Sequence, residues 1–178
     1  MLKYFVLSVF LLALTWQAFG DDQIAVKDDF GVTPVNNTDG IIIPQPRYAQ
    51  FSVSDKTYTF IYTPVNWYTA VELCNSQNQV IASITSSDES SRIYDTLYMN
   101  HLVNTGSSFW LGATEMGHYG RWAWFNTGRP ALYTNWKAGE PNNLYNKEHC
   151  LQMLSDGTWN DLDCDSQLLV ICQNRPGC

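Results

Sequence analysis

The stretch Gly139–Cys150, GEPNNLYNKEHC, holds two glutamates, three asparagines, one proline and a closing cysteine within twelve residues. It has neither the alternation of apolar and polar residues that marks a strand nor the apolar period of a helix. It overlaps the end of an irregular region, 127–146, that contains two glycines and two prolines. A loop of this length inside a compact domain is usually functional or disordered, so its polar side chains need a physical explanation.

The side chains in and just after this loop form a set of hard oxygen donors. Calcium takes six to eight oxygen ligands at about 2.3–2.6 Å, whereas zinc prefers histidine and cysteine. Three carboxylates would bring a formal charge of about −3 to a divalent cation of this kind. The sequence therefore predicts a calcium site formed by Glu140, Asn142, Glu148, Asn160 and Asp161.

The position of Pro141 between Glu140 and Asn142 has a structural consequence. Residues i and i+2 of an extended segment point to the same side, and a following proline biases Glu140 away from the α region. A cis bond before Pro141 would turn the two side chains further together. Only about 5–6% of such bonds are cis, so the residues alone do not predict it.

The segments before the loop predict a strand and a first helix. Residues 57–62, TYTFIY, are β-branched and aromatic and predict the strand. Asn66 is a suitable N-cap for a helix. One face of that helix, expected to be buried, is formed by Trp67, Ala70, Val71 and Cys74.

A second helix and several short strands complete the expected pattern. The helix is expected from Ser87, as its cap, to about Leu102, with Ile93 and Leu97 on its inner face. Short strands are expected at 109–112, 121–125, 150–154 and 167–172. One strand, two helices and then strands around a loop make an α+β fold.

The first twenty residues, MLKYFVLSVFLLALTWQAFG, differ from the rest of the chain. A single lysine precedes an apolar run, and Ala18 and Gly20 stand where a signal peptidase requires small residues. The alternative is a membrane anchor, but the apolar stretch 4–14 is shorter than the roughly 20 residues that span a bilayer. We therefore expect a signal peptide at 1–20, a weakly ordered tail at 21–46, one domain at 47–174 and a short tail at 175–178, in a secreted protein without membrane insertion.

The expected state of the cysteines follows from the expected secretory route. A secretory route is oxidising, so the five cysteines are expected to form disulfides. Five is an odd number, and the terminal Cys178 is the expected unpaired residue, which could join two chains in a homodimer. The other four allow three connectivities. In the tail, Asn36-Asn37-Thr38 is a sequon that makes Asn36 a candidate for glycosylation.

Charge and motif content exclude several classes of function. The formal net charge is −7, and removing Lys3 with the leader leaves nine basic against seventeen acidic residues, or −8. An acidic protein is a poor partner for nucleic acid or anionic membranes. The chain has no G-x-S-x-G, H-E-x-x-H or P-loop motif, and a glycosidase acid that must be protonated would not sit on calcium. An enzyme is therefore not expected.

Together the motifs resemble a C-type lectin domain over about 47–174. The matching segments are WLG at 110–112, WAW at 122–124, NW at 135–136, EPN at 140–142, EHC at 148–150, WND at 159–161 and the closing pair Cys164 and Cys172. The resemblance implies the α+β C-type lectin-like fold, with two helices, antiparallel sheets, a long calcium-binding loop and disulfides Cys74–Cys172 and Cys150–Cys164. It also implies a cis bond before Pro141 and the short form of the fold, which lacks an extra N-terminal disulfide.

The resemblance further implies how a sugar is bound. In that family, the residues matching the five predicted ligands bind one calcium ion, which coordinates two vicinal sugar hydroxyls. Each coordinated hydroxyl can still donate one hydrogen bond and accept one. Glu140 and Glu148 would accept such bonds, the amides of Asn142 and Asn160 would donate them, and Asp161 would remain a metal ligand.

The EPN order resembles lectins that prefer mannose, N-acetylglucosamine, glucose and fucose, whereas galactose-binding members usually carry Gln-Pro-Asp. We therefore expect glycans with terminal mannose-type sugars as partners, in the recognition of microbial or self glycans. The alternative is a protein-binding domain of the same fold that does not bind sugar. The complete ligand set argues against that alternative.

Residues around the expected site receive further expectations. Trp159 is expected to pack under the site and to aim Asn160 and Asp161, since aromatic rings are large hydrophobic groups first. Tyr145 and Asn143 lie on the loop and could touch a second sugar. The family's accessory calcium site corresponds to Glu115, Tyr119, Asn143 and His149, together with the shared Glu148. Of the first four, only Glu115 is a carboxylate, so the accessory site is expected to be absent or weak and the loop loosely held without metal.

Overall fold

The computed structural model describes residues 48–53, 55–99, 104 and 106–175. The expected leader at 1–20, the tail at 21–46, the sequon at Asn36 and the unpaired Cys178 lie outside the described residues. No helix in the described part is long and apolar enough to cross a membrane. The elements are β1 (Tyr48–Val53), β2 (Lys56–Val65), α1 (Trp67–Ser76), β3 (Gln79–Ile81), α2 (Ser87–Met99), β4 (Phe109–Thr114), β5 (Ala123–Trp124), the 3-10 turn η1 (Leu144–Asn146), β6 (Glu148–Met153), β7 (Trp159–Asp163) and β8 (Leu168–Asn174).

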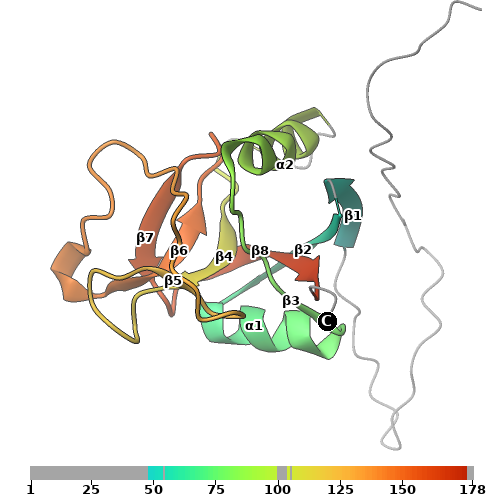
Figure 1. The fold of residues 1–178 in the computed structure, drawn as a ribbon. Coiled ribbons are helices and arrows are strands. Elements are labelled where there is room, and N and C mark those ends of the chain that lie inside the picture. Colours follow the sequence, from blue (N-terminus) through green and yellow to red (C-terminus); the bar gives the residue numbers. More distant parts are fainter. Residues whose placement is uncertain (1–47, 54, 100–103, 105, 176–178) are drawn as a thin grey trace, which may run out of the picture.

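One mixed sheet joins the strands, with α1 and α2 on different sides of it (Figure 1). The strand order is β1-β2-β8-β4-β6-β7, with β3 added on β8 and β5 on β4. All the pairings are antiparallel except that of β4 with β8, which is parallel. The expected α+β class is confirmed. The single parallel pair arises because the closing strand β8 inserts between β2 and β4 and runs opposite to β2.

Helix α1 follows the sequence prediction closely. Asn66 caps it, since its side-chain oxygen accepts a hydrogen bond from the Thr69 amide at 2.9 Å. Trp67, Ala70 and Cys74 are buried, as the i, i+3, i+7 spacing requires. Val71 is only half-buried and packs at the margin of the same cluster.

Helix α2 begins at Ser87, but its cap is Ser86 and not Ser87. The Ser86 hydroxyl accepts from the Glu89 amide at 3.2 Å, and the Ser86 carbonyl accepts from the Ser90 amide at 3.0 Å. Ile93 and Leu97 are buried as expected. The described helix ends at Met99, and the expected continuation to residue 102 lies outside the described residues.

The two expected disulfides are confirmed. Cys74 of α1 pairs with Cys172 of β8, and Cys150 of β6 pairs with Cys164 just after β7. All four cysteines are buried in one cluster with Trp67 and Trp110. The first bridge attaches α1 to the central strand, and the second holds the two strands that carry the candidate site.

The hairpin of β1 and β2 was not anticipated from the sequence, which predicted only its second strand. Its register runs from Tyr48↔Ile61 to Val53↔Lys56. Phe51 of β1 stacks on Tyr58 and Phe60 of β2, with ring centroids 5.2 and 4.9 Å apart. Neither strand contains a cysteine, so the absence of an extra N-terminal disulfide holds although the hairpin itself is present. Backbone pairing and aromatic packing hold it instead.

Candidate functional site

The candidate site lies where the loop before β6 meets strands β6 and β7. Glu148 opens β6, and Asn160 and Asp161 lie in β7. The strands pair antiparallel with Leu151 opposite Asp161 and a register shift after Glu148. This pairing brings together carboxylates that are thirteen positions apart in the chain, a proximity that local sequence cannot create.

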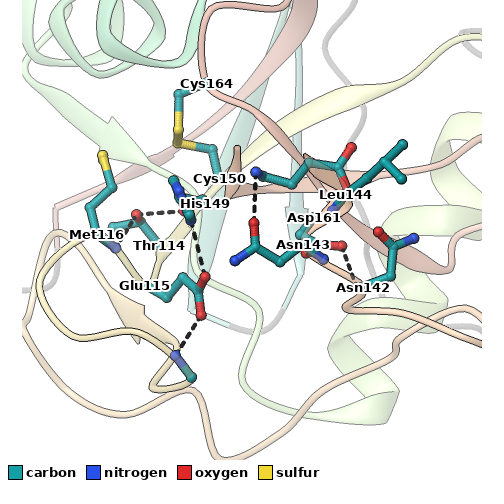
Figure 2. Close-up of polar contacts among 12 residues, drawn as sticks. Thr114, Glu115, Met116, Asn142, Asn143, Leu144, His149, Cys150, Asp161 and Cys164 are labelled. Atoms are coloured by element: carbon teal, nitrogen blue, oxygen red, sulfur yellow. Dashed lines mark hydrogen bonds and ion pairs between the residues drawn. A yellow bond between two sulfur atoms is a disulfide. The ribbon is translucent and has the colours of Figure 1, made fainter. Parts of the chain in front are cut away.

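Asp161 attaches the loop to β7. Its side chain is fully buried, and each of its two oxygens accepts a backbone hydrogen bond. The Asn142 amide donates to Oδ1 at 3.1 Å and the Asn143 amide to Oδ2 at 2.7 Å. Figure 2 shows Asn142 and Asn143 beside Asp161. Both loop residues are therefore fixed by one charge-assisted acceptor.

Glu148 makes a second attachment to the same loop. Its Oε2 accepts from the Leu144 amide at 3.0 Å, and its own amide donates to Asn143 Oδ1 at 3.1 Å. Burial raises the pKa of the Glu148 carboxyl, the Leu144 amide acts against this, and the negative charges of Asp161, Glu140 and Asp163 add to the increase. The carboxylates thus lie close enough to repel one another, and a cation among them would relieve that repulsion.

Glu140 carries the most informative atom of the site. Its Oε2 is buried and has no hydrogen-bond partner among the described residues. A carboxylate oxygen removed from water without a partner is costly, so this atom is suited to a cation. The Glu140–Pro141 peptide bond is cis, as the family resemblance implies and the general frequency of such bonds does not.

Asn160 is held by a residue that the sequence analysis missed. Its Nδ2 donates to Gln152 Oε1 at 3.1 Å and also contacts the Asp161 carbonyl. Gln152 faces Asn160 across the β6–β7 pair and is 7% exposed. Only the strand register could have identified this partner, because eight residues separate the two in the chain.

Calcium fits the chemistry of this donor set, in which asparagine side chains supply ligands in addition to the carboxylates. Within the described ranges, no group of three or more His, Cys, Asp and Glu side chains is arranged to hold a metal on its own. Two of the five predicted ligands are asparagines, whose side-chain carbonyls suit calcium. The five residues come from the loop and from both strands, and the loop's backbone amides already bind two of the carboxylates.

Trp159, which directly precedes Asn160 and Asp161 in β7, is a core residue, as expected. It is fully buried, and its ring meets those of Trp124, Tyr133 and Trp136 edge-on, with centroids 5.4–6.1 Å apart. Its backbone also supports the loop, since its amide donates to the Asn135 carbonyl at 2.8 Å and its carbonyl accepts from the Lys137 amide at 2.8 Å. The ring is therefore part of the core, and β7 is fixed on one side by packing and on the other by the loop.

Three of the positions that match the family's accessory calcium site, Glu115, Tyr119 and His149, contact one another directly. Glu115 is 5% exposed, and its Oε1 lies 3.1 Å from His149 Nδ1 while its Oε2 accepts from the Gly120 amide at 2.6 Å. An ionised carboxylate can only accept, so the ring nitrogen is the donor. The Tyr119 ring packs edge-on against His149 at 5.1 Å. The Glu115–His149 pair, visible in Figure 2, holds the segment 115–120 to β6.

A separate open groove of about 700 Å³ lies along the segment 114–134. Its lining includes His118, Arg121, Trp122 and Phe125. None of the five predicted calcium ligands lines it. The candidate site is thus a polar surface on the loop and β7 rather than the floor of this groove.

Comparison with known proteins agrees with this fold. The family model described as Lectin C-type domain matches residues 63–174, which is more than half of the chain. The chain belongs to the C-type lectin family. All five candidate ligands and both disulfides lie within this C-type lectin domain.

Three similar proteins illustrate the relationship. Human C-type lectin domain family 4 member K is 36% identical over 126 residues, which are 67% of this chain and 35% of that protein. The carbohydrate-recognition domain of the mouse scavenger receptor C-type lectin has a TM-score of 0.64 and 29% identity, covering 72% of this chain and 96% of that one. The cow CD23 carbohydrate-recognition domain, solved in the presence of a GlcNAc2Man3 oligosaccharide, has a TM-score of 0.63 and 27% identity, covering 76% and 98%. This chain spans 35–36% of the length of the first curated relatives it matches.

Proposed function

We propose that this C-type lectin domain binds carbohydrate through one calcium ion held by Glu140, Asn142, Glu148, Asn160 and Asp161. The observation that carries the proposal is the buried, unpartnered Oε2 of Glu140 beside the mutually repelling carboxylates. An oxygen of this kind gains a partner when a divalent cation binds. The arrangement is consistent with a cation-binding role for the loop rather than a purely structural one.

The sugar specificity that we propose is of the mannose type. Calcium would offer coordination positions to two vicinal hydroxyls, and the surrounding side chains complete their hydrogen bonds. Glu140 and Glu148 accept, while the amides of Asn142 and Asn160 donate. The oligosaccharide present with the cow CD23 domain, a relative of 27% identity, supports glycan binding as the general class of function.

We further propose that the protein is secreted and non-enzymatic, with its biological partners being glycans with terminal mannose, N-acetylglucosamine or fucose. The two buried disulfides support folding in an oxidising compartment. The N-terminal apolar segment supports export by its composition. Glycosylation at Asn36 and a homodimer through Cys178 remain part of the same proposal.

A glycan array with and without chelator tests the proposed function. We expect binding to terminal mannose, N-acetylglucosamine or fucose in calcium and its loss when calcium is chelated, because the two sugar hydroxyls would lose the ion that coordinates them. A parallel calcium titration should change the tryptophan fluorescence, since the buried Trp159 directly precedes two of the proposed ligands in β7. Absence of both signals would favour a protein-binding domain instead.

A further inference from the structure

The segment between β4 and the candidate site differs in charge from the whole chain. Residues 116–139 include the exposed Arg121, Arg129 and Lys137 and contain no aspartate or glutamate, although the chain has seventeen acidic residues against ten basic ones. Glu115, the acid just before the segment, is buried and bonded to His149 and to a backbone amide. The acidic net charge therefore conceals a local segment that carries only positive charge.

The open groove along 114–134 lies almost wholly within this acid-free segment. Its volume of about 700 Å³ falls in the range of roughly 300–1,000 Å³ that is usual for ligand sites. Most of its lining side chains are apolar, among them Met116, Trp122 and Phe125. Phe125 is 54% exposed and Met116 is 38% exposed. Large apolar side chains that gather in water around one groove indicate a binding surface.

Contacts with the start of α1 hold the apolar side of the groove in place. The Phe125 ring packs edge-on against the buried ring of Trp67, with centroids 5.2 Å apart. The Tyr68 hydroxyl donates to the Met116 sulfur at 3.4 Å. Figure 1 shows β5, which directly precedes Phe125, beside this end of the helix. A ligand would therefore meet a surface that is already ordered, which lowers the entropic cost of binding.

Arg121 brings an unpaired positive charge to the groove. Arg121 and His118 are the only lining residues that can carry a charge. In the described structure, no hydrogen bond or ion pair occupies the Arg121 guanidinium. A guanidinium binds a carboxylate through two parallel hydrogen bonds. Aromatic residues, methionine and arginine are also the types enriched in protein interfaces, so composition and charge together favour an acidic peptide as the ligand.

We propose that the groove along 114–134 is a docking site for an acidic peptide segment of a partner protein. Apolar side chains of the peptide would contact Met116, Trp122 and Phe125, and a carboxylate would bind Arg121. The inference goes beyond the proposed function, because none of the five candidate calcium ligands lines the groove and docking needs no calcium. Since the rest of the chain is acidic, an acidic peptide would be repelled elsewhere and attracted here.

A random peptide display library selected on the full-length protein in chelator tests the proposal. We expect the selected peptides to have an excess of aspartate and glutamate beside leucine, phenylalanine or tryptophan, and few basic residues. Synthetic copies should bind in fluorescence anisotropy, and less tightly as salt is added. Arg121→Glu should weaken this binding about tenfold or more, because it places like charges together. Arg121→Lys should keep most of the binding, since the charge is retained.

Arg175→Glu is the matched control, because it reverses the charge of an exposed arginine that follows β8, and it should bind the peptides as the wild type does. Selected peptides without an acidic excess would overturn the proposal, as would equal binding by Arg121→Glu and the wild type. Equal weakening by both charge reversals also overturns it, since net charge and not the groove would then attract the peptides. If heparin binds through Arg121 while no acidic peptide does, the ligand is a polysaccharide and the peptide proposal fails. All these measurements are made without calcium, so their failure leaves the proposed sugar binding standing.

Discussion

At the scale of single residues, we propose that the order of hydrogen-bond acceptor and donor at Glu140 and Asn142 decides which sugar the site prefers. Glu140 accepts and Asn142 donates in the proposed complex, so exchanging the two types should exchange the hydroxyl geometry that is favoured. We expect the double variant Glu140→Gln with Asn142→Asp to lose about tenfold or more in mannose affinity, because hydrogen bonds to charged groups are among the stronger ones. Its preference should move toward galactose.

A glycan array of the double variant beside the wild type measures this exchange. Arg129→Ala, an exposed change in the same irregular region but outside the Glu140–Asn142 segment, serves as the control and should keep the wild-type profile. Strong galactose binding by the wild type, with none to mannose, would contradict the assignment of specificity to these two residues.

Glu89 provides a residue-scale prediction of pH-dependent stability. It is 8% exposed and binds Lys56 Nζ at 2.6 Å and the Thr85 amide at 2.6 Å, and it also accepts from the Tyr58 hydroxyl. Burial acts to raise the pKa of Glu89, but the hydrogen bonds from Lys56, Thr85 and Tyr58 outweigh it and hold the pKa below its usual value of 4.5.

A carboxyl whose pKa is lower in the folded state stabilises the protein above its unfolded pKa, and this contribution is lost as the pH falls through the folded value. Glu89→Gln should therefore lower the free energy of unfolding by about 1–3 kcal/mol at pH 7. The difference from the wild type should shrink below about pH 4.5. Denaturant melts at several pH values would show this, with the exposed Glu72→Gln of α1 as control. A constant difference at all pH values would contradict the charge-based explanation.

At the scale of elements, side-chain contacts hold the segment after β4 to β6. Glu115 joins His149 and the Gly120 amide, and the Thr114 hydroxyl donates to the His149 carbonyl at 2.7 Å. The segment 115–120 and the loop that carries Glu140 are therefore fastened to β6 at adjacent residues, His149 and Glu148. Both segments are therefore bonded to the same strand, but through different residues.

Glu115→Ala should therefore loosen this segment without removing the proposed calcium ligands. The unpaired His149 ring and Gly120 amide should lower the free energy of unfolding by about 1–3 kcal/mol, and proteolytic cleavage within 116–121 should become faster. Limited proteolysis with and without chelator would measure this. The wild type should resist cleavage there in both conditions. Chelator-induced cleavage of the wild-type segment would show that a metal, and not the Glu115–His149 pair, holds it.

At the scale of the whole molecule, much of the architecture follows from local sequence. The Asn66 cap, the apolar spacing of α1 and the β-branched run of β2 are short-range features, so they were readable directly. The shift of the second cap from Ser87 to Ser86 shows the limit, because two adjacent serines have equal intrinsic capping ability and only the backbone path separates them. The EPN, EHC and WND segments are also local features, and they predicted the candidate site region.

The sequence by itself thus determined the helices, most strands and, through its family resemblance, the cysteine pairing, and it supplied the five candidate calcium ligands. Tertiary structure alone decided that β8 lies between β2 and β4, that Gln152 supports Asn160, that Glu115 binds His149, and that Tyr145 stands in a left-handed backbone beside the site. The physical reason is the separation along the chain of the residues that determine each feature. Caps and periodicity depend on neighbours within about one helical turn, whereas strand register and side-chain partners depend on residues brought together only when the sheet closes.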